Sequence, residues 1–309
     1  MRPVFADPKT DVVFKRLFGT EPHKPLLIAL LNALLELDEA HRIVDVRFLS
    51  LEQRLPLAEM KLSIVDVRCI DATGTHYVVE MQVFNVEGFE SRVFYNVAKA
   101  FVSQLRVGED YPKLNDVVGV TICDFILFPN ERDRPSVPML SRFRMQEQHV
   151  GTLALSQVQF VFLELPKYVG GENPSATVDR WALFFREAEN LQVVPAALSE
   201  GPFAEAMQAA RVSGFTEAEW EAYERAKVAE QDARGVVSFA EHEGHRRGRE
   251  EGLRDGRKDG LREGLRKAID DLCEVLDVPL DDARRRSLEA LQLEELELLR
   301  DRLKRERHW

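Results

Sequence analysis

The amino-acid sequence predicts an α/β fold that is followed by a helical C-terminal extension. Three observations lead to this prediction. Through the first 200 residues, segments with strand character are interleaved with segments of helical spacing. From residue 244 to residue 264, glycine stands at every fourth position among charged residues, and a leucine-rich, charged stretch follows. Hydrophobic residues make up 45% of the 309 residues, which leaves ample material for a core.

The first expected elements are two helices. One begins near Asp7 or Pro8 and ends around Gly19. A second, strongly apolar helix follows at residues 24–37, with a proline at its start and polar residues at its end. Segments rich in Val, Ile and Phe come next, and they indicate strands at residues 43–51, 61–70, 76–84 and 116–128.

The remaining elements of the α/β part are helices and two later strands. A segment of helical spacing at 89–111 lies between the third and fourth strands, and further strands are expected at 141–148 and 159–167. We interpret Asp124 and Glu164 as strand-end residues that accept hydrogen bonds from backbone amides. Residues 176–230 have helical character, with four aromatic packing anchors: Trp181, Phe184, Phe185 and Trp220.

The composition changes near Gly244, and this change divides the chain. Each glycine inside a helix costs roughly 1 kcal/mol relative to alanine, so the repeat makes a marginal isolated helix. We favour a partly ordered helical arm for self-association or DNA tethering, and a flexible charged linker is the alternative. The expected parts are an α/β domain (1–200), a helical connector (201–240), a Gly-xxx-Gly repeat arm (241–267) and a helical C-terminal tail (268–309).

Several classes of protein are disfavoured by composition. No apolar stretch approaches the roughly 20 residues of a membrane helix, and the N-terminus does not resemble a secretory signal. The three cysteines lack ligand spacing and indicate reduced thiols in a cytoplasmic protein, and the seven scattered histidines do not indicate a zinc site. The net charge of −11 would repel a polyanion, so a nucleic-acid partner would need local basic stripes and metal ions.

The strands expected at 61–70 and 76–84 flank a short polar loop with a glycine, which is typical of a β-hairpin. If the turn is centred on Thr73, paired residues have numbers that sum to 146, and Asp66 lies directly across from Glu80. Opposed side chains share a face of the sheet with Cβ atoms about 5 Å apart. Gln82 lies two residues further on and shares that face.

Two opposed carboxylates in apolar strands need a compensating cation, because each raises the pKa of the other. A divalent ion is one remedy, since Mg²⁺ is held by one or two carboxylates while it keeps waters for substrate phosphates. The alternative is a half-exposed hairpin whose polar face carries one acid on each strand. Spacing alone leaves both interpretations open.

Asp66, followed after thirteen residues by Glu80-Met81-Gln82, is similar to the D…(D/E)xK pattern of restriction-endonuclease-like enzymes. The chain more narrowly resembles the PD-(D/E)XK nuclease family of transposases, also called Rpn recombination-promoting nucleases. The resemblance spans nearly the whole chain. It is carried by PKTDVVFKRLFG, KLSIVDVRCID, HYVVEMQVFNVEGFESRVFYNVAKAFVSQLRVGEDY, FVFLELPKY, VDRWALFF and the glycine repeat.

The resemblance implies a restriction-endonuclease-like core, in which helices flank a mixed central sheet, over residues 1–200. It also implies that Asp66, Glu80 and the backbone carbonyl of Met81 hold Mg²⁺, or alternatively Mn²⁺. Gln82 stands where the superfamily usually has a lysine, and Val65 replaces the usual proline. Glutamine can orient a water by hydrogen bonding but supplies no positive charge, so a cation is expected from elsewhere.

Arg92 and Lys99 are seven residues apart on one face of the helix at 89–111. They could contact phosphate or replace the missing lysine, and a solvated helix face is the alternative. Asp11 and Lys15 form an i,i+4 pair on the first helix. The resemblance favours Asp11 as a further carboxylate beside the metal, and the role of Lys15 is left open.

The sequence therefore leads to the hypothesis of a cytoplasmic, Mg²⁺-dependent DNA endonuclease, linked to recombination or mobile elements, that dimerises through its C-terminal arm and does not contact membranes. The competing hypothesis is a DNA-binding or scaffolding protein with weak nuclease activity that self-associates through the glycine repeat.

Overall fold

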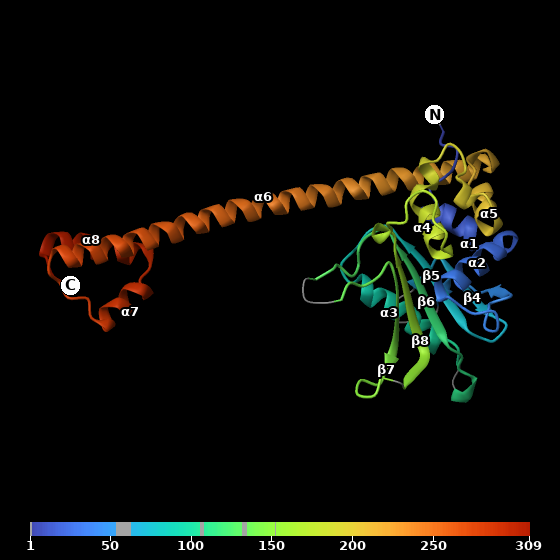
Figure 1. Cartoon of the computed structure of the whole chain (residues 1–309), viewed down its shortest axis with the longest axis horizontal. Coiled ribbons are helices and arrows are strands. Elements are labelled where there is room, and N and C mark those ends of the chain that lie inside the picture. The colour runs from blue at the N-terminus through green and yellow to red at the C-terminus, as the bar shows by residue number, and fades with distance from the viewer. Residues whose placement is uncertain (1, 54–62, 106–107, 132–134, 152) are drawn as a thin grey trace. The chain divides into compact units, whose positions relative to one another are not determined.

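In the computed structural model, residues 2–53, 63–105, 108–131, 135–151 and 153–309 are described. A six-stranded sheet with the order β1-β4-β5-β6-β8-β7 forms the centre of the first part of the chain (Figure 1). Strands β5, β6 and β8 run parallel to one another, whereas β1, β4 and β7 are antiparallel to their neighbours. The expected mixed sheet is therefore confirmed. Its strands are β1 (Val46–Phe48), β4 (Val67–Asp71), β5 (His76–Gln82), β6 (Val117–Cys123), β7 (Leu140–Gln146) and β8 (Ala154–Glu164), and a separate pair consists of β2 (Glu52–Gln53) and β3 (Ser63–Ile64).

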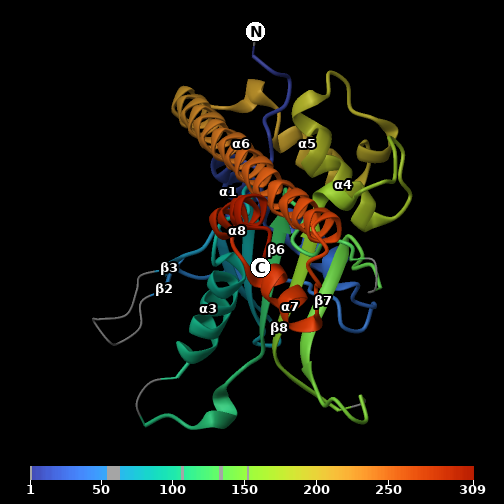
Figure 2. The ribbon, with the colours of Figure 1, turned by 90° about the vertical axis from the view of Figure 1, so that its left-hand side faces the viewer.

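Helices cover both faces of this sheet (Figures 1 and 2). The larger core packs one sheet face against four helices and includes all four expected aromatic anchors. These helices are α1 (Asp11–Phe18), α2 (Lys24–Leu35), α4 (Thr177–Glu187) and α5 (Gly201–Ala209). On the other face, α3 (Phe89–Val102) packs through Val97 and Ala100 on Val78 and Val117. Because α3 connects the parallel strands β5 and β6, it lies directly behind the strand that carries Glu80.

The first and third helices are shorter than the sequence predicts. Helix α1 begins at Asp11 rather than near Asp7, because Asp7 is used in a turn. Its Oδ1 atom accepts the backbone N–H of Lys9 at 2.9 Å, and its carbonyl accepts the hydroxyl of Thr10 at 2.9 Å. Helix α3 ends at Val102, nine residues before the predicted end at Tyr111. Residues 61 and 62 of the second predicted strand, 61–70, lie outside the described residues.

Gly119 of β6 allows α3 to approach the sheet closely. A Cβ atom at this position would lie 2.5 Å from Cγ2 of Val97 in α3 and 3.4 Å from Cδ1 of Phe160. We expect Gly119→Ala to lower the free energy of unfolding by about 1–3 kcal/mol, because a packed interior cannot absorb an extra methyl group without shifts. Chemical denaturation measures this change. Gly214→Ala is the matched control, since no heavy atom lies within 4 Å of its added methyl group.

The C-terminal part of the chain is helical. Helix α6 (Glu217–Val275) is followed by α7 (Asp282–Ala290) and α8 (Leu293–Glu306). Chain contacts separate two compact units, Met1–Ala229 and Glu230–Trp309. The second unit has its own small core, in which Ile269, Cys273, Leu288, Leu296 and Leu303 are buried. The subdivision expected at residues 200, 240 and 267 stays a prediction. No helix in the described part of the chain combines the length and apolar character that a membrane span needs.

Candidate active site

The hairpin of β4 and β5 has the register that the sequence predicts. Val67 pairs with Val79, and the numbers in all four residue pairs of this ladder sum to 146. If this register is continued by one residue, Asp66, which directly precedes β4, lies opposite Glu80. Oδ2 of Asp66 accepts a hydrogen bond of 2.8 Å from the backbone N–H of Met81. This hydrogen bond from the backbone to a side chain lies just beyond the ladder and holds the carboxylate at the end of the hairpin.

Glu80 lies on the face of β5 that α3 covers, and it is only 8% exposed. Asn96 of α3 donates a hydrogen bond of 2.6 Å from Nδ2 to Oε1 of Glu80. Burial raises the pKa of Glu80, whereas this hydrogen bond and the charge of Arg92 lower it. Sequence reasoning missed Asn96. The available signal was its place on the helix face of Arg92 and Lys99, four residues after one and three before the other.

Asp66 has the most perturbed carboxyl group of the site. Burial raises its pKa to about 7, and the negative charges of Asp11 and Glu80 act in the same direction. The N–H group of Met81 and the charge of Lys15 lower the pKa but do not offset the burial. The charged form of Asp66 is therefore poorly compensated by the protein itself.

Glu164 provides a contrast within the same sheet. This carboxylate at the end of β8 is fully buried, yet Lys167 Nζ lies 2.8 Å from its Oε1. Its other oxygen accepts the backbone N–H groups of Leu127 at 2.7 Å and Phe128 at 3.1 Å. The interpretation of Glu164 as an amide-capped strand end is confirmed. The charge of Glu164 is therefore compensated by a close cation and two amides. At Asp66, burial has a larger effect on the pKa than the groups that favour the charged form.

Helix α1 brings Asp11 and Lys15 to Asp66. Lys15 Nζ lies 2.6 Å from Oδ1 of Asp11 and 3.9 Å from Oδ1 of Asp66. The side chain of Lys15 is 34% exposed and that of Asp11 is 59% exposed. The first helix thus adds one anionic and one cationic group at the open side of the hairpin end.

Gln82 is held by its neighbours. Its Oε1 atom accepts a hydrogen bond of 2.6 Å from Arg92, and its Nε2 atom donates one of 2.9 Å to the carbonyl of Phe84. Arg92 therefore reaches the site from α3, as its position in the sequence suggested. Lys99 does not share this accessibility, because it is 3% exposed and its Nζ lies 5.5 Å from the ring centroid of Tyr95. Burial lowers the pKa of Lys99.

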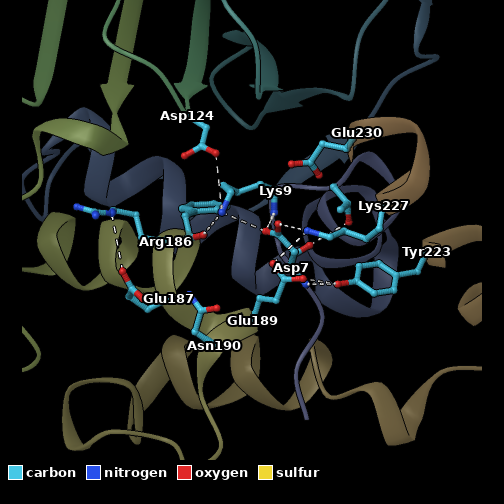
Figure 3. Close-up of polar contacts among 12 residues, drawn as sticks. Asp7, Lys9, Asp124, Arg186, Glu187, Glu189, Asn190, Tyr223, Lys227 and Glu230 are labelled. Carbon is cyan, nitrogen blue, oxygen red and sulfur yellow. Dashed lines mark hydrogen bonds and ion pairs between the residues drawn. The ribbon is translucent and has the colours of Figure 1, made fainter. Parts of the chain in front are cut away.

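A second polar cluster lies at the end of β6 (Figure 3). Lys9 Nζ is 3.9 Å from Oδ2 of Asp124 and 3.4 Å from Oδ1 of Asp7. Asp7 also has Lys227 Nζ at 3.1 Å from its Oδ2. The backbone N–H of Asp124 donates a hydrogen bond of 2.9 Å to the carbonyl of Gln82. The side chain of Asp124 thus joins this cluster and faces Lys9, and its interpretation as an amide-capped strand end stays a prediction.

The start of β4 and the end of β5, which lie side by side, have suitable oxygen donors for a hard divalent cation. Within the described ranges, no three His, Cys, Asp or Glu side chains gather as a metal site. Two carboxylates are nevertheless sufficient for Mg²⁺, which retains several waters. Backbone groups of successive strand residues point to opposite neighbours, and the carbonyl of Gln82 faces β6. The carbonyl of Met81 therefore points to the β4 side, where Asp66 lies.

A mixed sheet flanked by helices, with the partly buried Asp66 and the buried Glu80 at the end of its central hairpin, is typical of the class of restriction-endonuclease-like nucleases. A family model described as PD-(D/E)XK nuclease family transposase matches residues 8–240. The chain belongs to this family.

No curated protein and no solved structure matches the chain. Membership of the family indicates a nuclease or a transposase-related function, and nucleases of this class typically use divalent metal ions.

Proposed function

We propose that the protein is a Mg²⁺-dependent deoxyribonuclease that hydrolyses phosphodiester bonds in DNA, with Mn²⁺ as an alternative ion and a role in recombination or mobile elements. The observation that carries this proposal is the pair of carboxylates formed by the partly buried Asp66 and the buried Glu80. Burial raises the pKa of both groups. A divalent cation held by these residues would favour their charged forms and offset the cost of their burial.

In the proposed site, Asp66, Glu80 and the carbonyl of Met81 hold the metal. When bound, Mg²⁺ neutralises charge on the phosphate and lowers the pKa of a water. In the hydrolysis, the oxygen of one water forms a bond to phosphorus and one ester P–O bond breaks. One proton of that water goes to the leaving oxygen, and the other is released from the new phosphomonoester at neutral pH.

The other predicted residues surround this centre. Gln82 orients the attacking water with its remaining amide N–H, since its oxygen is occupied by Arg92. Arg92 adds positive charge at the same edge, and Asp11 adds a carboxylate beside Asp66. Lys99 is only 3% exposed, so we assign it a supporting positive charge in the interior and no direct contact with DNA.

The test is incubation of supercoiled plasmid with purified protein. Nicked or linear DNA should appear with Mg²⁺ or Mn²⁺, and an excess of EDTA should stop the reaction, because the carboxylates alone cannot neutralise the phosphate. Calorimetry should detect Mg²⁺ or Mn²⁺ binding that is lost in Asp66→Asn. The proposal is wrong if the protein binds neither ion and leaves plasmid and linear DNA intact.

One observation favours self-association as a second function. Nearly every residue of 231–261 in α6 is exposed, and a Cβ atom added at any of the six repeat glycines would meet nothing within 4 Å. The fold of a single chain therefore does not require these glycines, although together they cost about 6 kcal/mol of helix stability. Glycines at i and i+4 permit two helix backbones to approach closely. We propose that the arm pairs with the arm of a second copy.

We expect Gly252→Ala with Gly256→Ala to weaken this dimer by at least about tenfold, because two methyl groups would separate the backbones and loosen the packing. Sedimentation equilibrium measures the dissociation constant. The matched control is Gly235→Ala, which adds the same methyl group to α6 outside the four-residue series. A wild-type chain that stays monomeric at high micromolar concentration would contradict the proposal.

A further inference from the structure

We infer, resting on the proposed hydrolysis, that Lys15 of α1 is a catalytic residue of this site. Its ammonium group contacts the phosphate under attack and supplies the positive charge that Gln82 lacks. Sequence spacing could not assign Lys15, because an i,i+4 pair with Asp11 is equally typical of a solvated helix surface.

The contacts of Lys15 place a cation at the open side of the carboxylates. Its Nζ lies 3.9 Å from Oδ1 of Asp66, the oxygen opposite to the one that Met81 holds. The 2.6 Å contact with Asp11 aims the side chain along this edge. With 34% of the side chain exposed, the ammonium group can exchange its exposed partner Asp11 for a phosphate oxygen without crossing the interior.

The other described cations near the site are less suited to this role. Lys99 of α3 is only 3% exposed and is therefore not accessible to a phosphate of DNA. Lys9 is 11% exposed and faces Asp7 and Asp124. Arg92 is accessible, but its short hydrogen bond to Gln82 places it at the glutamine rather than at Asp66.

The face of α1 opposite to Lys15 is packed in the core. Val13, Phe14, Leu17 and Phe18 are fully buried, and the Phe14 and Phe18 rings pack on Phe185. The apolar face of the helix is thereby anchored in the core, and the opposite face presents Lys15 at the edge where Asp66 lies. A charge placed in advance where negative charge develops lowers the barrier without reorganisation.

The role of Lys15 is electrostatic. No bond forms to its nitrogen, and its protons stay on the ammonium group. The bond changes are those of the proposed hydrolysis, in which a water oxygen bonds to phosphorus and one ester P–O bond breaks. Lys15 lies beside the phosphate oxygens that gain negative charge during this change.

Two substitutions and one control test the assignment. Lys15→Met keeps the chain length and removes the charge, so the single-turnover cleavage rate at saturating Mg²⁺ should fall by about 100-fold or more. Lys15→Arg keeps the charge and should retain most of the rate. Lys24→Met is the matched control, because Lys24 forms comparable surface ion pairs with Glu21 and Asp45 away from the site. Equal thermal midpoints for all variants exclude a folding defect.

A second readout does not depend on cleavage. A lysine that contacts phosphate releases one counterion when DNA binds. The binding constant K for duplex DNA is measured at several salt concentrations with Ca²⁺ in place of Mg²⁺. The negative slope of log K against log salt should become shallower by about 0.9 in Lys15→Met. An unchanged slope overturns the phosphate contact. A Lys15→Met rate within about threefold of wild type, with Asp66→Asn inactive, overturns the Lys15 assignment and leaves the proposed function in place. A wild-type protein that does not cleave DNA overturns both.

Discussion

Replacing Asp66 by Asn, or Glu80 by Gln, is expected to slow DNA cleavage by about 10³-fold, because a metal-stabilised transition state loses several kcal/mol when a ligand is lost. Both substitutions keep the size of the side chain. Asparagine can still accept the N–H of Met81, and glutamine can still accept from Asn96, so the local hydrogen bonds persist. The measurement is the single-turnover rate constant on a linear duplex at saturating Mg²⁺.

The stability of the same variants separates a lost ligand from a lost fold. Without metal, Asp66→Asn should be at least as stable as wild type at neutral pH, because it removes a charge that burial disfavours. Glu164→Gln is the matched control, since it breaks the contact with Lys167 and should lose about 1–3 kcal/mol. If Asp66→Asn and Glu80→Gln cut DNA as fast as wild type, the assignment of the site is wrong. If they unfold as readily as Glu164→Gln, slower cleavage reports on folding instead.

The hairpin could be predicted from sequence because its geometry is local. A loop of a few residues between Asp71 and His76 leaves few registers, and only registers with an even sum keep Asp66 and Glu80 on one face. The alternation of apolar residues on both strands then predicts which face of the sheet carries the two carboxylates. Register, face and the identity of the two carboxylates therefore follow from about twenty consecutive residues.

Contacts between distant segments could not be predicted in this way. Lys15 and Asp66 meet because α1 packs in the core, for example through Phe18 on Trp181 of α4, and no short-range pattern encodes that packing. The spacing of Arg92 and Lys99 correctly placed both on one face of α3. It did not reveal the difference in exposure between them, since Lys99 is buried while Arg92 stays accessible.

Asp7→Asn is expected to lower the free energy of unfolding by about 2 to 3 kcal/mol at pH 7, because removing one partner leaves buried charge uncompensated. Asp7 is 2% exposed and faces both Lys9 and Lys227. Burial alone would raise the pKa of Asp7, but the two lysines and the N–H of Lys9 outweigh it and lower the pKa. Denaturation by urea, followed by the fluorescence of Trp181 and Trp220 in the α/β unit, measures the loss.

The pH dependence identifies the charge of Asp7 as the cause. A carboxyl group whose pKa is lower in the folded state stabilises the fold above its unfolded pKa of about 3.9, and this contribution disappears as the pH falls through the folded value. The difference in unfolding free energy between wild type and Asp7→Asn should therefore be largest at pH 7 and become smaller in acid. Asp38→Asn removes an exposed carboxylate paired with His41 and should change stability little. A gap that stays constant into acid would mean that packing, and not charge, holds Asp7 in its turn ahead of the helix that carries Asp11 and Lys15.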